Sequence, residues 1–288
     1  MNRMPVRTFN RLKMNESRLE YAQGDVRELN IEESLRLDYN RDEDIRINVK
    51  VRDGEELSLI VNFTFKGSAG LEINGKVGRG SALTVIEADN AARTGKLISR
   101  VHVSVSDEGD FKHIQLYPAR GDVYTDCIVD LEGKGSSFDA GMAYLGRGGQ
   151  ILDINHVATH YGKKSRSHIH ADGVLMDRAS KLFKGTIDFK TGCAGSKGQE
   201  QEKVLLLGDE IINRSIPVIL CTEEDVEGSH GAAIGSMDEE MLLYLQSRGL
   251  SEDDARRMVI KGMFGRLLDE INDEEISEMT VKQLAEVV

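Results

Sequence analysis

Histidine side chains that could bind a metal ion gather in one stretch of this sequence. His168 and His170, in SHIH, fall on the same face of a strand because side chains alternate sides along an extended chain. His156 and His160 stand a few residues upstream. Neutral imidazole is a common ligand for zinc, iron and copper. The stretch is therefore a candidate metal site.

A metal site built on this pair would need a further ligand. An HxH pair is typical of cupin barrels when a glutamate follows a few residues later, and the segment ADGVLMD after His170 contains none. We therefore interpret His168 and His170 as exposed histidines on a strand face. A cupin-like metal-binding β protein is the alternative.

The cysteines indicate a reducing environment. Cys127, Cys193 and Cys221 make an odd number with no CxxC pair, which argues against a disulfide framework or a structural zinc site and favours the cytoplasm. Cys193 lies in the glycine turn TGCAG and could be exposed. Cys221 ends the apolar strand PVILC, and we expect it and Cys127 to be packed as small hydrophobes.

His230 stands apart from the other histidines. It lies between small residues in EGSHGAAIGS, just before the first helical pattern of the chain. An isolated histidine is most often part of the packing. Its position, where the strands end and the helices begin, makes His230 a candidate functional residue.

Composition and charge exclude several classes of protein. A net charge of −12 argues against a nucleic-acid or anionic-membrane surface. No stretch approaches the roughly 18 apolar residues of a membrane span, and the basic N-terminus lacks the apolar run of a signal peptide. The sequence contains no P-loop, kinase motif set, GxSxG or HExxH. We expect a soluble cytoplasmic protein that binds no nucleotide and is not an enzyme by itself.

Most of the chain is predicted to be β-structure. Residues 1–44 are charged and weakly patterned, and we expect an arm with some helix. Residues 45–235 begin with the alternating IRINVKV and continue as short strands separated by glycine, asparagine and aspartate turns. A sandwich, a barrel and a solenoid all fit. Recurring corners such as GRGSA, GKGSS and GRGGQ favour a parallel β-helix, or β-solenoid, although no strict repeat is visible.

Residues 236–288 are predicted to be helical. Ser236 and Glu239 have the spacing of a capping box, and Gly249 would end that helix. Ser251 would begin a second helix. Its apolar residues recur at helical spacing: Ile260, Met263, Phe264, Leu267, Leu268 and Ile271. These helices either cap the solenoid or dock a partner.

The segment from about Leu131 to Ile271 resembles the SufB/SufD family, whose members are subunits of the SUF iron–sulfur cluster assembly machinery. The resemblance is carried by LEGKGSSFDAGMAYLGRGGQILDINHVATH, by GVLMDRASKLFKGTIDF, and by a third run from LLLGDEIINRSIPVILC through SHGAAIGS to YLQSRGLSEDDA. Residues 1–90 match only in general character. The resemblance implies a right-handed parallel β-helix followed by C-terminal helices.

The resemblance also implies partners. Members of the family pair through their β-helices, and their terminal helices dock on an ABC-type ATPase called SufC, to which ATP hydrolysis belongs. We therefore expect a SufC-like ATPase to contact Tyr244, Arg248, Gly249 and Phe264. A SufB-like subunit, or a second copy of this chain, would pair with the β-helix. No nucleic acid or membrane is expected to bind.

For iron–sulfur chemistry the resemblance points to three residues. His230 matches the family position associated with cluster assembly. Glu202 stands where SufB has a sulfur-accepting cysteine, and Ser229 and Gly231 stand where SufB has glutamates, so the chain is closer to SufD. Glu202 could act as an oxygen ligand for iron, and Cys193 is a displaced thiol. We expect these residues to meet a transient iron–sulfur cluster.

The sequence shows no preformed ligand set, so we expect the isolated chain to hold no stoichiometric metal. The leading hypothesis is a non-catalytic scaffold subunit of a SUF-type complex. Beside the cupin-like reading, the other alternative is a β-solenoid adaptor without cluster chemistry.

Overall fold

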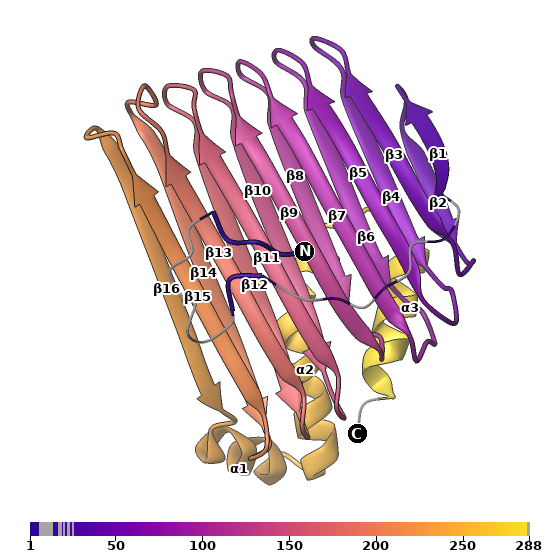
Figure 1. Cartoon of the computed structure of the whole chain (residues 1–288). Helices are drawn as coiled ribbons and strands as arrows, with labels where there is room; N and C mark the ends of the chain where they lie inside the picture. The colour runs from indigo at the N-terminus through magenta and orange to yellow at the C-terminus, as the bar shows by residue number, and fades with distance from the viewer. Residues whose placement is uncertain (6–13, 17–18, 20, 22–23, 25, 287–288) are drawn as a thin grey trace.

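Alternating apolar residues build the repeating unit of the fold. The computed structural model describes residues 1–5, 14–16, 19, 21, 24 and 26–286. In β3 (Asp44–Val51) the side chains of Ile45, Ile47 and Val49 are buried, as the alternation in the sequence predicts. Similar strands stack in two layers with their inward side chains forming one continuous core (Figure 1).

The odd-numbered and even-numbered strands form separate sheets. Sheet A, in spatial order, contains β1 (Val26–Ile31), β3 (Asp44–Val51), β5 (Ala69–Val77), β7 (Lys96–Val105), β9 (Asp122–Leu131), β11 (Ile151–His160), β13 (Ser180–Phe189) and β15 (Ile212–Cys221). Sheet B contains β2 (Leu35–Tyr39), β4 (Glu56–Phe63), β6 (Ala82–Asp89), β8 (Asp110–Tyr117), β10 (Ser137–Gly146), β12 (Arg166–Met176), β14 (Ser196–Leu207) and β16 (Val226–Ser236).

Each strand pairs in parallel with the strand two places along the chain, so the chain alternates between the sheets as a solenoid does. The predicted β-solenoid with C-terminal helices is confirmed. The cupin-like alternative is wrong as a fold, because these are two stacks of parallel strands and a cupin is an antiparallel double-sheet barrel.

The length of one turn of the solenoid drifts along the chain. Asp44 pairs with Gly70, 26 residues later, whereas Ser180 pairs with Ile212, 32 residues later. This drift explains why the sequence shows no strict repeat.

Glycines turn the predicted corners. The second glycines of GRGSA, GKGSS and GRGGQ are Gly80, Gly135 and Gly148, which adopt φ values of 59°, 70° and 62°. Residues other than glycine rarely adopt this left-handed backbone conformation. The recurring Gly-x-Gly pattern is therefore a corner pattern, as the sequence predicted.

The solenoid begins earlier than the sequence indicated. β1 and β2 fall within residues 1–44, and they pair with β3 and β4. The regular secondary structure among the described residues of 1–44 is therefore β-strand. The prediction of an arm with some helix was wrong for these residues. Residues 6–13 lie outside the described residues.

The helical region contains α1 (Glu239–Ser247), α2 (Glu252–Asp269) and α3 (Glu274–Ala285). Asp238 caps α1 by accepting a hydrogen bond from the Glu240 N–H, so the prediction that Ser236 is the cap was wrong: Ser236 is still in β16. Gly249, at a φ of 93°, follows α1, and Ser251 caps α2, both as predicted.

The apolar stripe of α2 packs on the outer face of sheet B. Ile260, Phe264, Leu267 and Ile271 are buried against outward residues of β6, β8, β10 and β12. Polar contacts hold α3: Arg36 of β2 forms an ion pair with Asp273 at 2.7 Å. α2 and α3 thus cover the middle of the outer face of sheet B (Figure 1).

The N-terminal segment covers the opposite face. Met4 and Met14 pack with Ile216 on the outer side of sheet A, and Lys184 donates a hydrogen bond from Nζ to the Asn2 carbonyl at 2.9 Å. In Figure 1 the described parts of this segment, drawn in indigo, lie on the opposite side of the solenoid from the helices. Both faces of the solenoid are therefore partly covered, while among the described residues no further strand stacks on the end formed by β15 and β16.

Candidate functional site

The solenoid ends at two neighbouring strands, β15 in sheet A and β16 in sheet B. Each is the last strand of its sheet, so within the described residues one edge of each has no strand beside it. Such an edge presents unpaired backbone N–H and C=O groups. β16 is exposed along nearly all of its length. This open end of the solenoid is exposed and carries His230, one of the predicted site residues.

His230 lies in the middle of β16 and is exposed. It pairs in register with Glu200 of β14, and Glu200 is only 3% exposed. Partners in register lie on the same side of a sheet, so the His230 side chain projects on the inward side, where a further turn of the solenoid would stack. His230 is therefore accessible to anything that adds to the open end.

Glu200 is a residue that the sequence reasoning missed. Its carboxylate lies against Gly185 across the interior, and a Cβ at Gly185 would stand 2.5 Å from the Glu200 carboxyl carbon. Burial, with the neighbouring Glu202 adding to it, raises the pKa of Glu200 to about 8. Sequence alone gave one hint, the alternation of acidic and polar residues in GQEQEKV.

Glu202 lies inside the solenoid rather than at its end. It is 2% exposed and forms an ion pair with Lys181 at 2.5 Å. It also accepts hydrogen bonds from Tyr144 at 3.0 Å and Ser215 at 2.5 Å. Burial lowers the pKa of Lys181, although Glu202 opposes that shift. Glu202 could bind iron only by giving up some of these partners.

The cysteines are placed differently from the expectation. Cys193 is fully buried beside Ile187 and Phe189, so its predicted exposure was wrong. Cys221 is exposed, so its predicted packing was also wrong, because β15 has no further turn to cover it. Cys127 is buried, as predicted.

The structure does not bring Cys193 to His230. Cys193 precedes Ser196, the first residue of β14, and Ser196 stands four residues before Glu200, the partner of His230 in register. Four residues of strand span about 13 Å. Of the three residues predicted to meet a cluster, His230 and Glu202 lie on adjacent strands, and Cys193 lies at the far corner.

His168 and His170 share one face of β12, the outer face of sheet B, as the sequence predicted, but the predicted exposure was wrong for His170, which is only 7% exposed. Each bonds to a carboxylate of its own: His168 to Asp139 at 3.3 Å and His170 to Asp172 at 2.7 Å. His160 is buried and bonds to two serine hydroxyls. These three histidines have structural partners and do not converge.

The residues predicted to contact a partner fall into two groups. Tyr244 on α1 is 57% exposed, and the guanidinium of Arg248 stacks on its ring at 5.4 Å from the centroid. Gly249 follows directly. Phe264 is fully buried against sheet B, so it supports α2 and is not on the surface.

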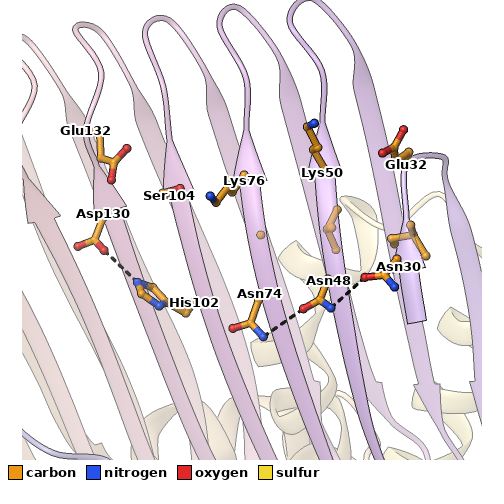
Figure 2. A pocket seen from close by; sticks show the side chains of 13 residues that line it. Asn30, Glu32, Asn48, Lys50, Asn74, Lys76, His102, Ser104, Asp130 and Glu132 are labelled. Atoms are coloured by element: carbon orange, nitrogen blue, oxygen red, sulfur yellow. Dashed lines mark hydrogen bonds and ion pairs between the residues drawn. The ribbon is translucent and has the colours of Figure 1, made fainter. Parts of the chain in front are cut away.

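A groove of about 630 Å³ lies on the outer side of sheet A at the opposite end (Figure 2). Asn48 donates a hydrogen bond to Asn30 at 3.0 Å, and Asn74 donates one to Asn48 at 3.4 Å. His102 bonds to Asp130 at 2.9 Å. These side chains bond to one another along the sheet, so the groove adds nothing to the site at the open end.

The raised pKa of Glu200 predicts a pH effect on stability. Between about pH 4.5, where a free glutamate ionises, and about pH 8, the folded chain keeps a proton that the unfolded chain loses. The free energy of unfolding therefore falls as the pH rises through this window. Glu200→Gln should lack this loss of stability. The free energy of unfolding of the variant, relative to that of the natural chain, should therefore increase between pH 5 and pH 8 by on the order of a few kcal/mol.

Urea unfolding of both chains at pH 5 and pH 8 measures the effect. Glu224→Gln, which neutralises an exposed carboxylate in the corner before β16, is the matched control and should follow the natural chain. Parallel pH dependences for Glu200→Gln and the natural chain would contradict a raised pKa.

Comparison with known proteins identifies the fold family. The model of the SufBD core domain of SUF-system iron–sulfur cluster assembly proteins matches residues 42–263. The iron–sulfur cluster assembly protein SufD of Bacillus subtilis is 31% identical over 168 residues, which cover 58% of this chain and 38% of that protein. A SufBD family protein of Mycobacterium tuberculosis is 25% identical over 240 residues, covering 81% of this chain and 60% of that protein.

A SufBD family protein of Staphylococcus saprophyticus is 27% identical over 157 residues, covering 54% of this chain and 33% of that protein. The matched region thus spans between one third and three fifths of these relatives. No helix among the described residues is long and apolar enough to cross a membrane. Because the family match covers most of the chain and includes both the solenoid and the start of the helices, the chain belongs to the SufBD core family of iron–sulfur cluster assembly proteins.

Proposed function

We propose that this chain is a non-catalytic scaffold subunit of a SUF-type assembly complex in the cytoplasm. A SufC-like ABC ATPase docks on the helical region, and a second solenoid chain, either a SufB-like subunit or another copy, stacks on the open end. Iron and sulfide are substrates that combine at that junction and leave as a cluster. The observation that carries the proposal is an accessible histidine on a terminal strand that has one free edge, in a chain of the SufBD core family.

The surface of α1 supports docking of a partner. Met241, Leu243 and Tyr244 are 48%, 64% and 57% exposed, and Met258 on α2 is 52% exposed. α1 contacts α2 and, unlike α2 and α3, has no extensive contact with a sheet. Exposed apolar side chains gathered on one short helix are typical of a protein-binding surface.

The open end supports the pairing of two solenoids. Ile234 of β16 is 49% exposed although it lies in register with Val204, which is buried. A second solenoid would cover this inward-facing apolar residue and pair the free backbone groups of β16. Its surface would then lie over His230.

The chain connection links the two surfaces. β16 ends at Ser236 and α1 begins at Glu239, so only two residues separate the strand that carries His230 from the helix proposed to dock the ATPase. A movement of α1 driven by ATP hydrolysis in the partner would act directly on β16. This coupling gives the ATPase a route to the assembly site.

Of the three predicted ligands, His230 can bind iron without any rearrangement of the fold, because it is exposed and a neutral imidazole is a competent iron ligand. Glu202 and Cys193 are buried and would contribute only after β14 or its preceding corner moved. A β-solenoid adaptor without cluster chemistry is the second candidate, favoured by the engagement of Glu202 with Lys181.

If the ATPase docks on α1, substitutions on the surface of α1 should weaken ATPase binding without lowering the stability of the chain. Leu243→Ser combined with Tyr244→Ala should abolish co-purification with a co-expressed SufC-like ATPase and leave the melting temperature nearly unchanged, because both side chains are mostly exposed. Phe264→Ala should instead lower the free energy of unfolding by about 3–5 kcal/mol, the usual cost of truncating a buried phenylalanine.

The control for this test is Ile151→Ala, which removes an exposed apolar side chain from β11 and should keep the ATPase bound. Undiminished binding by the α1 double variant would place the docking surface elsewhere.

His230→Ala predicts a defect in cluster formation alone. His230 is exposed, so its truncation should change stability by no more than about 0.5 kcal/mol and leave ATPase binding intact. Cluster yield, measured from the absorbance of the anaerobically reconstituted complex, should fall severalfold. Ser229→Ala, which alters the neighbouring outward position, is the control. An unchanged yield would favour the adaptor alternative, and a collapse in stability would make His230 a packing residue.

A further inference from the structure

His113, Cys127 and His156 meet inside the solenoid, away from the open end. His113 comes from β8 of sheet B, whereas Cys127 and His156 pair in register on β9 and β11 of sheet A. All three side chains are fully buried. Each offers a ligand atom, and these atoms lie within 4.8 Å of one another. Two consecutive strands and the strand one turn later thus bring two imidazoles and a thiol to one point.

The hydrogen bonds around His156 leave one of its ring nitrogens bare. The Gln115 amide nitrogen donates to Tyr117 and Thr125, so the Gln115 oxygen is free to accept from His156 Nε2 at 2.8 Å. Burial, helped by His113, lowers the pKa of His156 to about 3 and keeps the ring neutral. With the proton on Nε2, Nδ1 carries a lone pair, and it has no hydrogen-bond partner among the described residues.

His113 is held in the same way. Its Nε2 lies 2.9 Å from a carboxylate oxygen of Glu87, and Glu87 also accepts hydrogen bonds from Ser99 and Tyr117, both at 3.0 Å. Its Nδ1, like that of His156, is buried and without a partner in the described part of the chain. A carboxylate or amide on the far nitrogen is the arrangement that orients a metal-binding histidine and makes it more basic.

We propose that His113, Cys127 and His156 form a resident site for a borderline-soft divalent metal ion, Zn²⁺ in the first instance. The donors are the two bare Nδ1 atoms and the Cys127 sulfur. On binding, the thiol loses its proton to solvent and a sulfur–metal bond forms, so one proton leaves for each ion bound.

The donor set selects the class of metal. Two imidazole nitrogens and a thiolate suit Zn²⁺ and neighbouring transition metals, whereas Mg²⁺ and Ca²⁺ require oxygen ligands. Donor atoms at about 2.0–2.3 Å from zinc lie roughly 3.3–3.8 Å apart. One ring nitrogen of each histidine and the Cys127 sulfur lie within 4.8 Å of one another, so a small closing movement of the side chains completes the site. Three protein donors leave a fourth position for a small ligand such as water.

Such an ion would join the two sheets in the middle of the solenoid. A buried nitrogen without a hydrogen-bond partner destabilises the fold, and the ion satisfies both bare nitrogens at once. This role differs from cluster assembly, because His230 lies on the terminal strand and this group lies on β8, β9 and β11. The inference does not depend on the function proposed above.

Full burial dictates how the site is loaded. With all three side chains inaccessible, the ion binds as the chain folds and exchanges slowly afterwards. The full chain should therefore be unfolded, stripped of metal with a chelator, and refolded anaerobically without iron or sulfide, in the presence of either Zn²⁺ or Co²⁺.

After removal of free metal, elemental analysis should find about one ion per chain. The Co²⁺ form should show a near-ultraviolet thiolate-to-cobalt charge-transfer band. Cys127→Ser should lose this band, and His156→Gln should lower metal content at least tenfold. Cys221→Ser, which removes the exposed thiol, should retain both.

X-ray absorption of the zinc-loaded natural chain provides a second measurement that needs no variant. It should show one sulfur at about 2.3 Å and two imidazole nitrogens at about 2.0–2.1 Å. Less than a tenth of an ion per natural chain, a thiolate band that survives Cys127→Ser, or a zinc shell without sulfur would each overturn the proposal.

Discussion

The structure depends on the pairing of each strand with the strand one turn later. Parallel pairing lets one continuous chain build two sheets whose inward faces share a core, and it repeats from β1 and β2 to β15 and β16. This pairing can always continue with another strand, so it does not by itself close the sheets. Whatever strand comes last keeps a free edge and an uncovered inward face, and here that strand carries His230. The candidate site is thus a direct result of the architecture.

The outer faces of the two sheets are partly covered by other segments, whereas the end of the solenoid at β16 is exposed. Helices α2 and α3 bury the apolar outer residues of sheet B, and the N-terminal segment packs on sheet A. Among the described residues, β16 stays exposed along nearly all of its length. α1, the helix nearest to β16 in the chain, keeps its apolar residues on the surface. Two uncovered surfaces separated by two residues of chain are what a scaffold driven by a partner requires.

Local patterns in the sequence predicted the local structure well. The alternation of Ile45, Ile47 and Val49, the Gly-x-Gly corners and the Ser251 cap each depend on residues close together in the chain, and the structure has all of them. The start of the solenoid was missed because β1 and β2 are only six and five residues long and lie in a highly charged segment, although Leu35, Leu37 and Tyr39 of β2 do alternate. Ser236 was mistaken for a cap because a serine before an acidic residue fits the end of an edge strand equally well.

The interior chemistry could not be predicted because it depends on the stacking of turns. The drift from 26 to 32 residues per turn hides which residues meet, so neither the contact of His113 with His156 nor that of Glu202 with Lys181 is visible in the sequence. The exposure of Cys193 and Cys221 was reversed for the same reason. Cys193 is buried in one cluster with Ile187 and Phe189, while Cys221 lies in the last described turn of the solenoid and is exposed.

The central claim is that the free edge of β16 is where a second solenoid chain joins during cluster assembly. Amide hydrogen exchange of β16 tests it directly, by comparing the isolated chain with the assembled complex that contains the ATPase and the second solenoid. The account predicts that the alternate amides of Val226–Ser236 that point to the free edge exchange quickly in the isolated chain and become protected in the complex, while the amides that face β14 and those of buried β11 are protected in both. Fast exchange of β16 in a complex that still forms clusters would contradict the account.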